Sequence, residues 1–263
     1  GIHVFYLDSR LRGNDISNKV VKLFQRHYTR RVKLMSNRLR GRVAVVTGSG
    51  QGIGRAIAIA MAKEGAMIVT NNRKPGSTGL GTYGESIQRA MNNDEKEIAM
   101  RLSGDAETTA NQIKDMGGEA VPFFGDVSNF EVARKLIDTA VESFGTVDIL
   151  VNNASTFRRN LVWESNEEDW NHVFLVKPKS YFNCIRHAAP LMIEQGWGRI
   201  INTTSSAWLG QPYIAIYSAA NAGVVGLTRS VAREVYEYGI TCNAFSPRAL
   251  TRAAVSTKTF YRL

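Results

Sequence analysis

Ser205 and Tyr217 are two side chains whose types and spacing could carry out proton transfer. Ser205 lies just after a predicted strand at 199–203, and Tyr217 lies twelve residues further on, near the start of a predicted helix at 214–236. The pair means little by itself, because a tyrosine that packs at a helix start is a common structural feature. Behind a dinucleotide-binding turn, however, two such hydroxyl groups indicate a donor set for the reduction of a carbonyl group.

A glycine-rich turn at 47–54, which reads Thr-Gly-Ser-Gly-Gln-Gly-Ile-Gly, predicts such a site. The apolar run at 43–46 predicts a buried parallel strand before it, and the run at 55–63 predicts a helix after it. Free backbone N–H groups and the positive end of the helix dipole would then face a phosphate. A lone glycine cluster could be an ordinary tight turn, but both flanking elements favour a dinucleotide site. The candidate cofactor contacts here are Gly48, Ser49, Gln51, Gly52, Ile53 and Gly54.

Cofactor preference depends on the residues that follow the predicted strand at 66–70. NAD-binding proteins of this architecture place an acidic residue there, which bonds the ribose 2′-hydroxyl. This sequence has Asn71 and Asn72, followed by Arg73 and Lys74. Without a carboxylate, a 2′-phosphate is not repelled and Arg73 could pair with it, although both basic residues could equally be solvated in a loop. We therefore expect NADP as the cofactor, with Asn72 and Arg73 as contacts and NAD as the alternative.

Strands and helices alternate from Arg42 onward, which predicts an α/β fold with a Rossmann-type, doubly wound parallel sheet in a single domain. The connection at 75–104 is long and is interpreted as an insertion, in which the polar segment 85–101 could form one surface helix. The other predicted strands lie at 120–124, 147–152 and 240–245, and the other predicted helices at 106–116, 129–143 and 167–195, the last interrupted by Pro178.

The net charge of +10 is concentrated in residues 1–40, which hold ten Lys and Arg residues against two Asp. Such a segment could bind nucleic acid or a membrane surface, or act as a transit peptide. Its few apolar residues show no sustained period, so we expect a poorly ordered basic extension, or sequence upstream of a native start at Met35. We expect the domain at 41–263, and no nucleic-acid binding.

The sequence contains no run of about 18 apolar residues, so no membrane-spanning helix is expected. Cys184 and Cys242 lie far apart and match no metal or redox spacing. We expect buried free thiols and a cytoplasmic protein, because thiols persist in reducing compartments. The four histidines show no metal spacing, so no metal is expected.

Several motifs together resemble the short-chain dehydrogenase/reductase family, over roughly residues 41–252. The segment 243–252 is similar, more weakly, to 3-oxoacyl reductases and (3R)-hydroxyacyl-CoA dehydrogenases. The motifs, in order, are Thr47-Gly48-x-x-x-Gly52-x-Gly54, Asp126-Val127, Asn152-Asn153-Ala154, Ser205 and Tyr217-Ser218-Ala219-Ala220.

This resemblance implies hydride transfer between a nicotinamide and a carbonyl or secondary alcohol carbon, on a 3-oxoacyl or 3-hydroxyacyl substrate. Tyr217 would act as the general acid and base, and Ser205 would bond the same substrate oxygen. Family members commonly form homo-oligomers, here a dimer or tetramer through helices near 129–195 and 214–236. The remaining implied cofactor contacts are Asp126 and Val127 at the adenine, and Asn153 and Ala154 beside the cofactor.

The sequence departs from the family's pattern at four places. Asn221 stands where the family has its active-site lysine, whose charge favours the ionised tyrosine and which holds the nicotinamide ribose. Lys177 stands at the family's catalytic asparagine, and Ser155 replaces a glycine after Ala154. The chain also stops at Leu263, so we expect the last strand of the family's sheet to be missing.

The changes at 177 and 221 are reciprocal and allow two interpretations. Lys177 could place a replacement ammonium near Tyr217, while Asn221 could still bond the ribose hydroxyls without supplying charge. Both residues are therefore candidates for the catalytic set. Alternatively, both changes are damage in a nucleotide-binding pseudoenzyme or fragment that is no longer selected for catalysis. The short C-terminal part favours this second interpretation.

Overall fold

The computed structural model describes residues 37–76, 85–101 and 103–249. These residues contain six strands, which form one parallel sheet in the order β3-β2-β1-β4-β5-β6. The order reverses between β1 and β4, as in the doubly wound Rossmann-type sheet that the sequence predicts. The strands are β1 Val43–Val46, β2 Met67–Asn72, β3 Ala120–Phe124, β4 Ile149–Asn152, β5 Gly198–Thr203 and β6 Ile240–Phe245.

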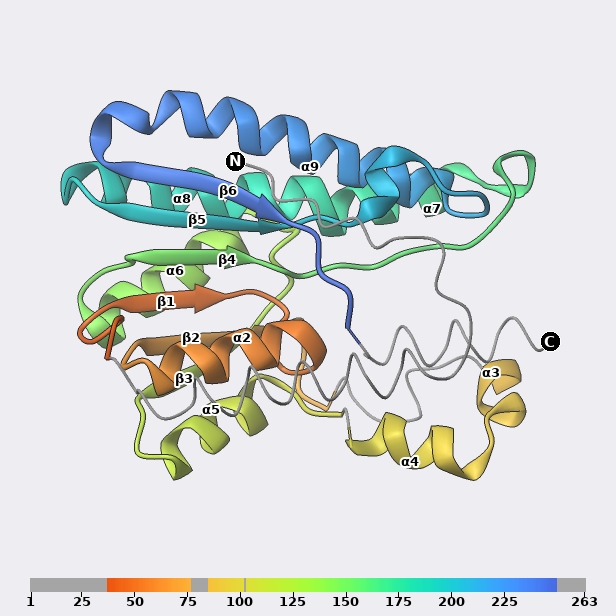
Figure 1. Ribbon diagram of the computed structural model, residues 1–263, viewed down its shortest axis with the longest axis horizontal. Coiled ribbons are helices and arrows are strands. Elements are labelled where there is room, and N and C mark those ends of the chain that lie inside the picture. Colours follow the sequence, from red (N-terminus) through yellow and green to blue (C-terminus); the bar gives the residue numbers. More distant parts are fainter. Residues whose placement is uncertain (1–36, 77–84, 102, 250–263) are drawn as a thin grey trace, which may run out of the picture.

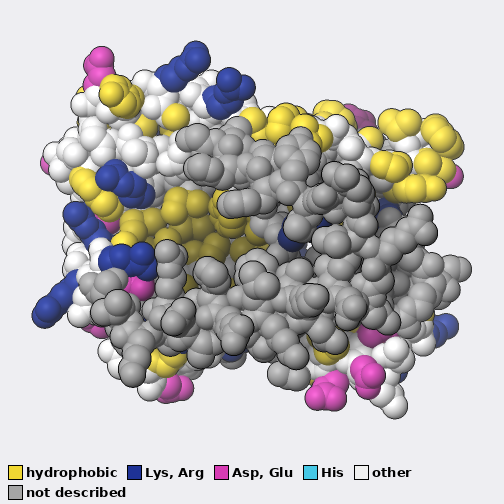
Figure 2. Space-filling model, in the orientation of Figure 1, with side chains coloured by type: hydrophobic (Ala, Val, Ile, Leu, Met, Phe, Trp, Pro, Cys, Tyr) yellow, Lys and Arg dark blue, Asp and Glu magenta, His cyan; other side chains and the backbone are white. Residues whose placement is uncertain are grey.

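Helices cover both faces of this sheet (Figure 1). On one face α2 and α5 pack against β1, β2 and β3, and on the other face α6, α8 and α9 pack along the sheet. No helix of the described residues lies in front of β5 and β6 in Figure 1. Figure 2 shows a hollow on this same side, where hydrophobic side chains gather beside several Lys and Arg side chains. The helices named so far are α2 Gly52–Lys63, α5 Ala106–Asp115, α6 Phe130–Phe144, α8 Ser180–Glu194 and α9 Ala215–Glu234.

The central strand β1 shows why the sequence has an unbroken apolar run at 43–46. All four of its residues are fully buried. Val43 and Val45 pack into the cluster formed with α6, α8 and α9, whereas Ala44 and Val46 pack into the cluster formed with α2 and α5. Successive side chains of a strand point to opposite faces, so both faces must be apolar here. The two clusters hold the end of β1, and therefore the glycine-rich turn, in a fixed place.

The prediction of one surface helix at 85–101 is wrong, because two helices form there, α3 Glu85–Ala90 and α4 Asn93–Arg101. Asn92 lies between them: its Oδ1 accepts a hydrogen bond from the backbone N–H of Glu95, and Glu95 Oε2 accepts one from the N–H of Asn92. This reciprocal capping starts a new helix. Nor is α4 wholly at the surface, since Ala99 is buried.

The predicted interruption of the helix at 167–195 is confirmed. The chain forms α7 Glu167–Phe174, a π-helical turn at Leu175–Lys179, and then α8. Pro178 cannot donate a backbone hydrogen bond, and the wider π turn accommodates it. This π turn packs against α7, α8 and α9, and it buries the side chain of Lys177.

Most of the predicted extension at 1–40 lies outside the described residues, and so does the chain after Ala249, where the last strand is expected to be missing. Within 37–40, Arg38 pairs with Glu64 at 2.9 Å. Cys184 and Cys242 are buried free thiols, as predicted, and burial raises the pKa of each to about 12. No helix in the described part of the chain is both long and apolar enough to cross a membrane.

Candidate active site

The predicted site residues gather at one edge of the sheet, toward which the strand arrows point in Figure 1. The turns after β1, β2, β3, β4 and β5 meet at this edge, and each carries at least one predicted residue. The strand order reverses between β1 and β4, where open α/β sheets leave a crevice for a ligand. The fold therefore brings the candidate residues to the place where a dinucleotide would bind.

The glycines of the turn after β1 are required by the protein's own packing. Gly48 and Gly52 have positive φ angles, 62° and 56°. A Cβ atom on Gly48 would lie 2.9 Å from the Cα of Ala154, and one on Gly54 would collide with the Gly48 carbonyl and the Asn153 amide. The turn thus lies directly against the chain after β4. The sequence predicts glycines here for the approach of a pyrophosphate, but it gives no sign of this contact.

The start of α2 is open to an anion. Gln51 is its N-cap residue, and no side-chain hydrogen bond caps the helix. The amides of the first turn, which begins with Gly52 and Ile53, therefore lack a side-chain acceptor and can bind a phosphate. In addition, Gln51 Oε1 is buried and has no hydrogen-bond partner among the described residues. These features fit a dinucleotide pyrophosphate.

Asn153 and Ala154 brace the glycine-rich turn. Asn153 donates from Nδ2 to the carbonyls of Thr47 at 3.1 Å and Gly48 at 3.2 Å. The Thr47 hydroxyl accepts hydrogen bonds from the backbone N–H groups of Asn153 and Ala154, at 2.9 and 3.1 Å. The observed contacts of these two residues are with the turn, so they position the proposed cofactor site from behind.

Ser49 is also used within the protein. It is fully buried, its hydroxyl accepts a hydrogen bond from the N–H of Asn71 at 2.8 Å, and its own N–H donates to the Asn71 carbonyl at 2.9 Å. The Asn71 side chain donates to the Gly125 carbonyl at 3.1 Å. This chain of bonds ties the turns after β1, β2 and β3 together.

Asp105 is a residue at this edge that the sequence argument missed. It is the N-cap of α5, where its carboxylate accepts hydrogen bonds from the N–H groups of Thr108 at 2.9 Å and Gly76 at 3.1 Å. Although burial opposes the shift, these bonds lower its pKa. A Cβ atom on Gly50 would collide with both the Asn72 side chain and the Asp105 backbone. Folding therefore brings a carboxylate to the end of β2, where the sequence shows none.

Arg73 and Asp126 face α7 across the same edge. Arg73 is exposed, and Asp126 Oδ1 accepts a hydrogen bond from the N–H of Ser128 at 3.0 Å. Burial lowers the pKa of His172 on α7, the charges of Arg158 and Arg73 lower it further, and Asp126 acts in the opposite sense. Arg73, Asp126 and Arg158 thus all lie near enough to His172 to influence its pKa.

Val127 is buried beneath this edge. Asn183 of α8 donates from Nδ2 to the carbonyls of Val127 and Ser128, at 3.1 and 3.0 Å. Sequence reasoning did not single out Asn183, which is fully buried and fixes the turn after β3.

Ser205 and Tyr217 lie on two elements that pack against each other. Ser205 caps the 3-10 helix Ser206–Leu209, where its hydroxyl accepts a hydrogen bond from the Ala207 N–H at 3.3 Å, and this helix packs against α9. Tyr217 lies in the first turn of α9, half-buried, with its ring 6.0 Å from that of Phe157 in an edge arrangement. Both residues are partly exposed, so neither side chain is sealed in the core.

Lys177 is the most unusual charged residue of this region. Its side chain is fully buried, and its Nζ donates to the Thr203 carbonyl at 2.9 Å and to the Tyr181 hydroxyl at 3.5 Å. The same Nζ lies 5.4 Å from the ring centroid of Tyr181 and 5.6 Å from that of Tyr217. Burial lowers the pKa of Lys177 to about 7.

Asn221 is fully buried one turn after Tyr217 on α9. Its Nδ2 donates to the Tyr217 carbonyl at 2.7 Å, and its Oδ1 accepts a hydrogen bond from the Thr204 hydroxyl at 3.4 Å. The Asn221 amide is therefore already hydrogen-bonded within the protein. These bonds compete with the expected bonds to the ribose hydroxyls. No group of three or more candidate metal ligands occurs among the described residues.

The chain matches the family model described as short chain dehydrogenase over residues 75–260. It is 37% identical over 213 residues to the peroxisomal multifunctional enzyme type 2 of Drosophila melanogaster, which covers 81% of this chain and 32% of the fly enzyme. It is 36% identical over 205 residues to the 3-oxoacyl-[acyl-carrier-protein] reductase FabG of Staphylococcus aureus, which covers 78% of this chain and 72% of the reductase. The chain thus spans about a third of the fly enzyme.

Solved structures show the same likeness. A short chain dehydrogenase from Mycobacterium avium superposes with a TM-score of 0.67 and 38% identity, over 80% of this chain and 68% of that one. An NAD⁺-bound xylitol dehydrogenase superposes with a TM-score of 0.66 and 28% identity, over 80% and 71%. The resemblance inferred from the motifs is confirmed.

Proposed function

The chain belongs to the short-chain dehydrogenase family of oxidoreductases, and from this premise we propose that it transfers a hydride between a nicotinamide cofactor and a carbonyl or secondary alcohol. The observation that carries the proposal is Tyr217, which is half-buried at the start of α9, with Ser205 on the element packed against that helix. When bound, the nicotinamide supplies or accepts the hydride.

The two hydroxyl groups account for the proton. In the direction of reduction, Tyr217 donates its phenol proton to the substrate oxygen as the carbonyl carbon gains a hydride. Ser205 donates a hydrogen bond to the same oxygen and stabilises its developing negative charge. In the direction of oxidation, ionised Tyr217 removes the alcohol proton. Each direction moves one proton and one hydride, so charge and atoms balance.

The cofactor would lie along the edge built by the turns after β1 to β4. The uncapped start of α2 and the buried, unpartnered atoms Gln51 Oε1 and Asn72 Oδ1 support this placement. We propose NADP as the cofactor, held at its 2′-phosphate by Arg73 and Asn72. Asp105 acts against this preference, because its carboxylate repels a phosphate.

The substrate we propose is a 3-oxoacyl or 3-hydroxyacyl compound. This rests on the name of the staphylococcal relative, a 3-oxoacyl-[acyl-carrier-protein] reductase. It also rests on apolar residues that remain exposed near the proposed reaction centre: Leu209 is 59% exposed and ends the 3-10 helix that Ser205 caps, and Tyr213 is 48% exposed four residues before Tyr217. An acyl chain would bury such surface.

We also propose that two copies associate through the face formed by α7, α8 and α9. A groove of about 440 Å³ on this face is lined by Phe174, Leu175, Phe182 and Leu227, among others. Leu175 and Phe182 are 40% and 48% exposed, although both are large and apolar. A dimer in sedimentation velocity that becomes a monomer in Phe182→Asp would support this pairing. The two buried free thiols agree with the cytoplasmic location that we propose.

The test of the main function is a titration of the purified chain with NADPH and NADH, followed by assays with 3-oxoacyl and 3-hydroxyacyl thioesters. Binding to the native state raises the unfolding temperature by mass action. Stabilisation by NADPH together with turnover supports the proposal. Stabilisation without turnover on any carbonyl substrate supports the alternative, a nucleotide-binding pseudoenzyme, which Asn221 favours because it brings no charge to Tyr217. No stabilisation by either nucleotide contradicts both.

A further inference from the structure

Lys177 lacks the partner that a buried charge needs. It is 1% exposed, and in the part of the chain that the structure describes no carboxylate pairs with it. Its bonds are to a carbonyl oxygen and a phenol, both uncharged. Burial lowers its pKa. An isolated buried ammonium is strongly disfavoured, so the charged form of Lys177 requires an anion nearby.

The titratable groups that face Lys177 are Tyr181 on α8 and Tyr217 on α9. No charged residue of α7, which also packs against the π turn, contributes to its pKa. Tyr181 is fully buried, and burial raises its pKa well above the ordinary value, so it remains a neutral phenol. Its hydroxyl donates to the Thr203 carbonyl at 3.1 Å, the acceptor that Lys177 also uses. Tyr217 is the other phenol beside Lys177, and its side chain is only half-buried.

We propose that Lys177 supplies the positive charge that stabilises the ionised form of Tyr217, and so acts as the positioning residue for its proton transfer. The catalytic role of Lys177 in this inference rests on the proposed function. Lys177 lies in the π turn, with its Nζ beside Tyr181 of α8 and Tyr217 of α9. In contrast, Lys179, two residues further on, is exposed and bonds the Ser128 carbonyl at 3.0 Å.

The two charges would stabilise each other. An ammonium at Lys177 lowers the pH at which Tyr217 ionises, and a phenolate at Tyr217 holds the proton on Lys177. The position one turn after Tyr217 cannot supply this charge, because Asn221 occupies it and bonds the Tyr217 carbonyl.

The direct test is a phenolate titration of the full chain at 295 nm, in which the difference between the unaltered protein and Tyr217→Phe isolates the Tyr217 signal. In Lys177→Met we expect the midpoint of this signal to rise by about 1–3 pH units, the effect of removing an opposite charge at this range. Lys179→Met is the matched control and should leave the midpoint unchanged. An unchanged midpoint in Lys177→Met would overturn the proposal.

Lys177→Met should fold, since Tyr181 still bonds the Thr203 carbonyl after the change. If it does not fold, Lys177→Gln, which keeps a donor for that carbonyl, takes its place in the titration. The double exchange Lys177→Asn with Asn221→Lys should lower the midpoint again, because it returns a charge to the neighbourhood of Tyr217. Failure of that rescue, with the protein folded, would also count against a charge effect.

A second readout separates this inference from the proposed function. Where the chain oxidises alcohols, Lys177→Met should lose at least about tenfold in kcat at pH 7 and recover as the pH approaches 10, because the phenolate then forms without help. A purely structural role would lower kcat equally at every pH and would overturn the inference. If no variant turns over but the phenolate midpoint shifts, the pairing stands and the proposed function fails.

Discussion

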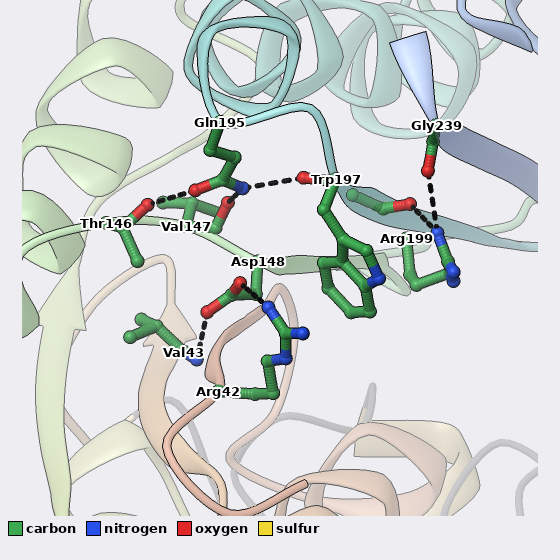
Figure 3. A network of polar contacts seen from close by, with 10 residues as sticks. Arg42, Val43, Thr146, Val147, Asp148, Gln195, Trp197, Arg199 and Gly239 are labelled. Atoms are coloured by element: carbon green, nitrogen blue, oxygen red, sulfur yellow. Dashed lines mark hydrogen bonds and ion pairs between the residues drawn. The ribbon is translucent and has the colours of Figure 1, made fainter.

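The two edges of the sheet differ in how completely their polar groups are paired. At the edge where the strands begin, the Asp148 carboxylate accepts hydrogen bonds from the Val43 N–H at 2.9 Å and from Arg42 Nη1 at 2.7 Å. The ring of Trp197 lies between the guanidinium groups of Arg42 and Arg199, at 3.7 and 4.3 Å from its centroid (Figure 3). These contacts join the starts of β1, β4 and β5 to one another.

Gln195 completes the same network. Its Nε2 donates to the carbonyls of Val147 and Trp197, at 3.0 and 2.7 Å, and its Oε1 accepts a hydrogen bond from the Thr146 hydroxyl at 2.7 Å (Figure 3). Both polar atoms of the amide are therefore used within the protein. These bonds join the end of α8 to the start of β4.

The opposite edge is less complete. Several buried side-chain atoms there have no hydrogen-bond partner among the described residues, and buried polar atoms without partners destabilise a fold. A ligand with donors and acceptors would satisfy them. The difference fits the proposal that a cofactor and a substrate bind at this edge, which we call the binding edge. The unpartnered atoms at this edge include Gln51 Oε1, Asn72 Oδ1, Thr203 Oγ1 and Ser218 Oγ.

The largest expected effect comes from the binding edge. Tyr217→Phe removes the proposed general acid but only one hydroxyl from a half-buried position. We expect kcat to fall by about 10³-fold, within the range for removing an acid–base catalyst, while the unfolding free energy changes by less than about 0.5 kcal/mol. Steady-state kinetics and urea unfolding would measure the two. Equal activity in the variant would remove Tyr217 from the mechanism.

The corresponding experiment at the edge where the strands begin replaces Asp148. Asp148→Ala leaves the buried N–H of Val43 without an acceptor and separates Arg42 from its partner. We expect the unfolding free energy to fall by about 3 kcal/mol, with NADPH affinity unchanged in the folded protein. Asp138→Ala, which breaks an exposed pair with Arg134 on α6, is the control and should change stability by less than about 0.5 kcal/mol. A loss of NADPH affinity in Asp148→Ala would contradict the idea that the edge where the strands begin affects stability without affecting cofactor binding.

The sheet could be predicted from the sequence because the patterns that indicate it are local. The apolar run at 43–46, the turn at 47–54 and the regular alternation of strands and helices each lie within a short window, and the doubly wound order follows from them. The positions of Ser205 and Tyr217 at this edge followed in the same way, since the ends of neighbouring parallel strands share an edge.

What the sequence did not reveal depends on contacts between distant elements. Asp105 reaches the end of β2 from the far side of the insertion, more than thirty residues along the chain. The burial of Lys177 depends on a π turn, which the sequence predicted only as an interruption at Pro178. The stack of Trp197 with Arg42 and Arg199 brings the residue before β1 onto the start of β5, and no local pattern predicts such a contact.

The third prediction concerns how the free energy of unfolding depends on pH. It applies to Lys177, which lies near the binding edge but also affects the stability of the fold. Burial lowers its pKa from 10.5 to about 7, so the unfolded chain binds more protons than the folded chain between these values. The folded protein therefore becomes relatively more stable as the pH rises through this window. Between pH 7 and 9, its unfolding free energy should rise by about 2 kcal/mol relative to that of Lys177→Met, as urea unfolding at each pH would measure.

Cys184 and Cys242 also have shifted pKa values, but both proteins contain them, so their effect cancels in this difference. A constant difference between pH 7 and 9 would mean that the folded protein loses no proton at Lys177 in this window, which would contradict this prediction.

The smallest expected effects lie within the binding edge, where Arg73 and Asp105 bear opposite charges near the end of β2. Arg73→Ala should weaken NADPH binding by about tenfold, roughly 1.4 kcal/mol, and leave NADH binding unchanged, because only NADPH carries the 2′-phosphate. Asp105→Asn should strengthen NADPH binding a few-fold by removing a repelling charge, and it keeps the cap of α5, since Asn is as good an N-cap as Asp. Isothermal titration with both cofactors measures all four constants. If Asp105→Asn instead weakens NADH binding and leaves NADPH unaffected, then Asp105 bonds the ribose hydroxyl, and the carboxylate that folding brings to this edge makes the protein an NAD enzyme.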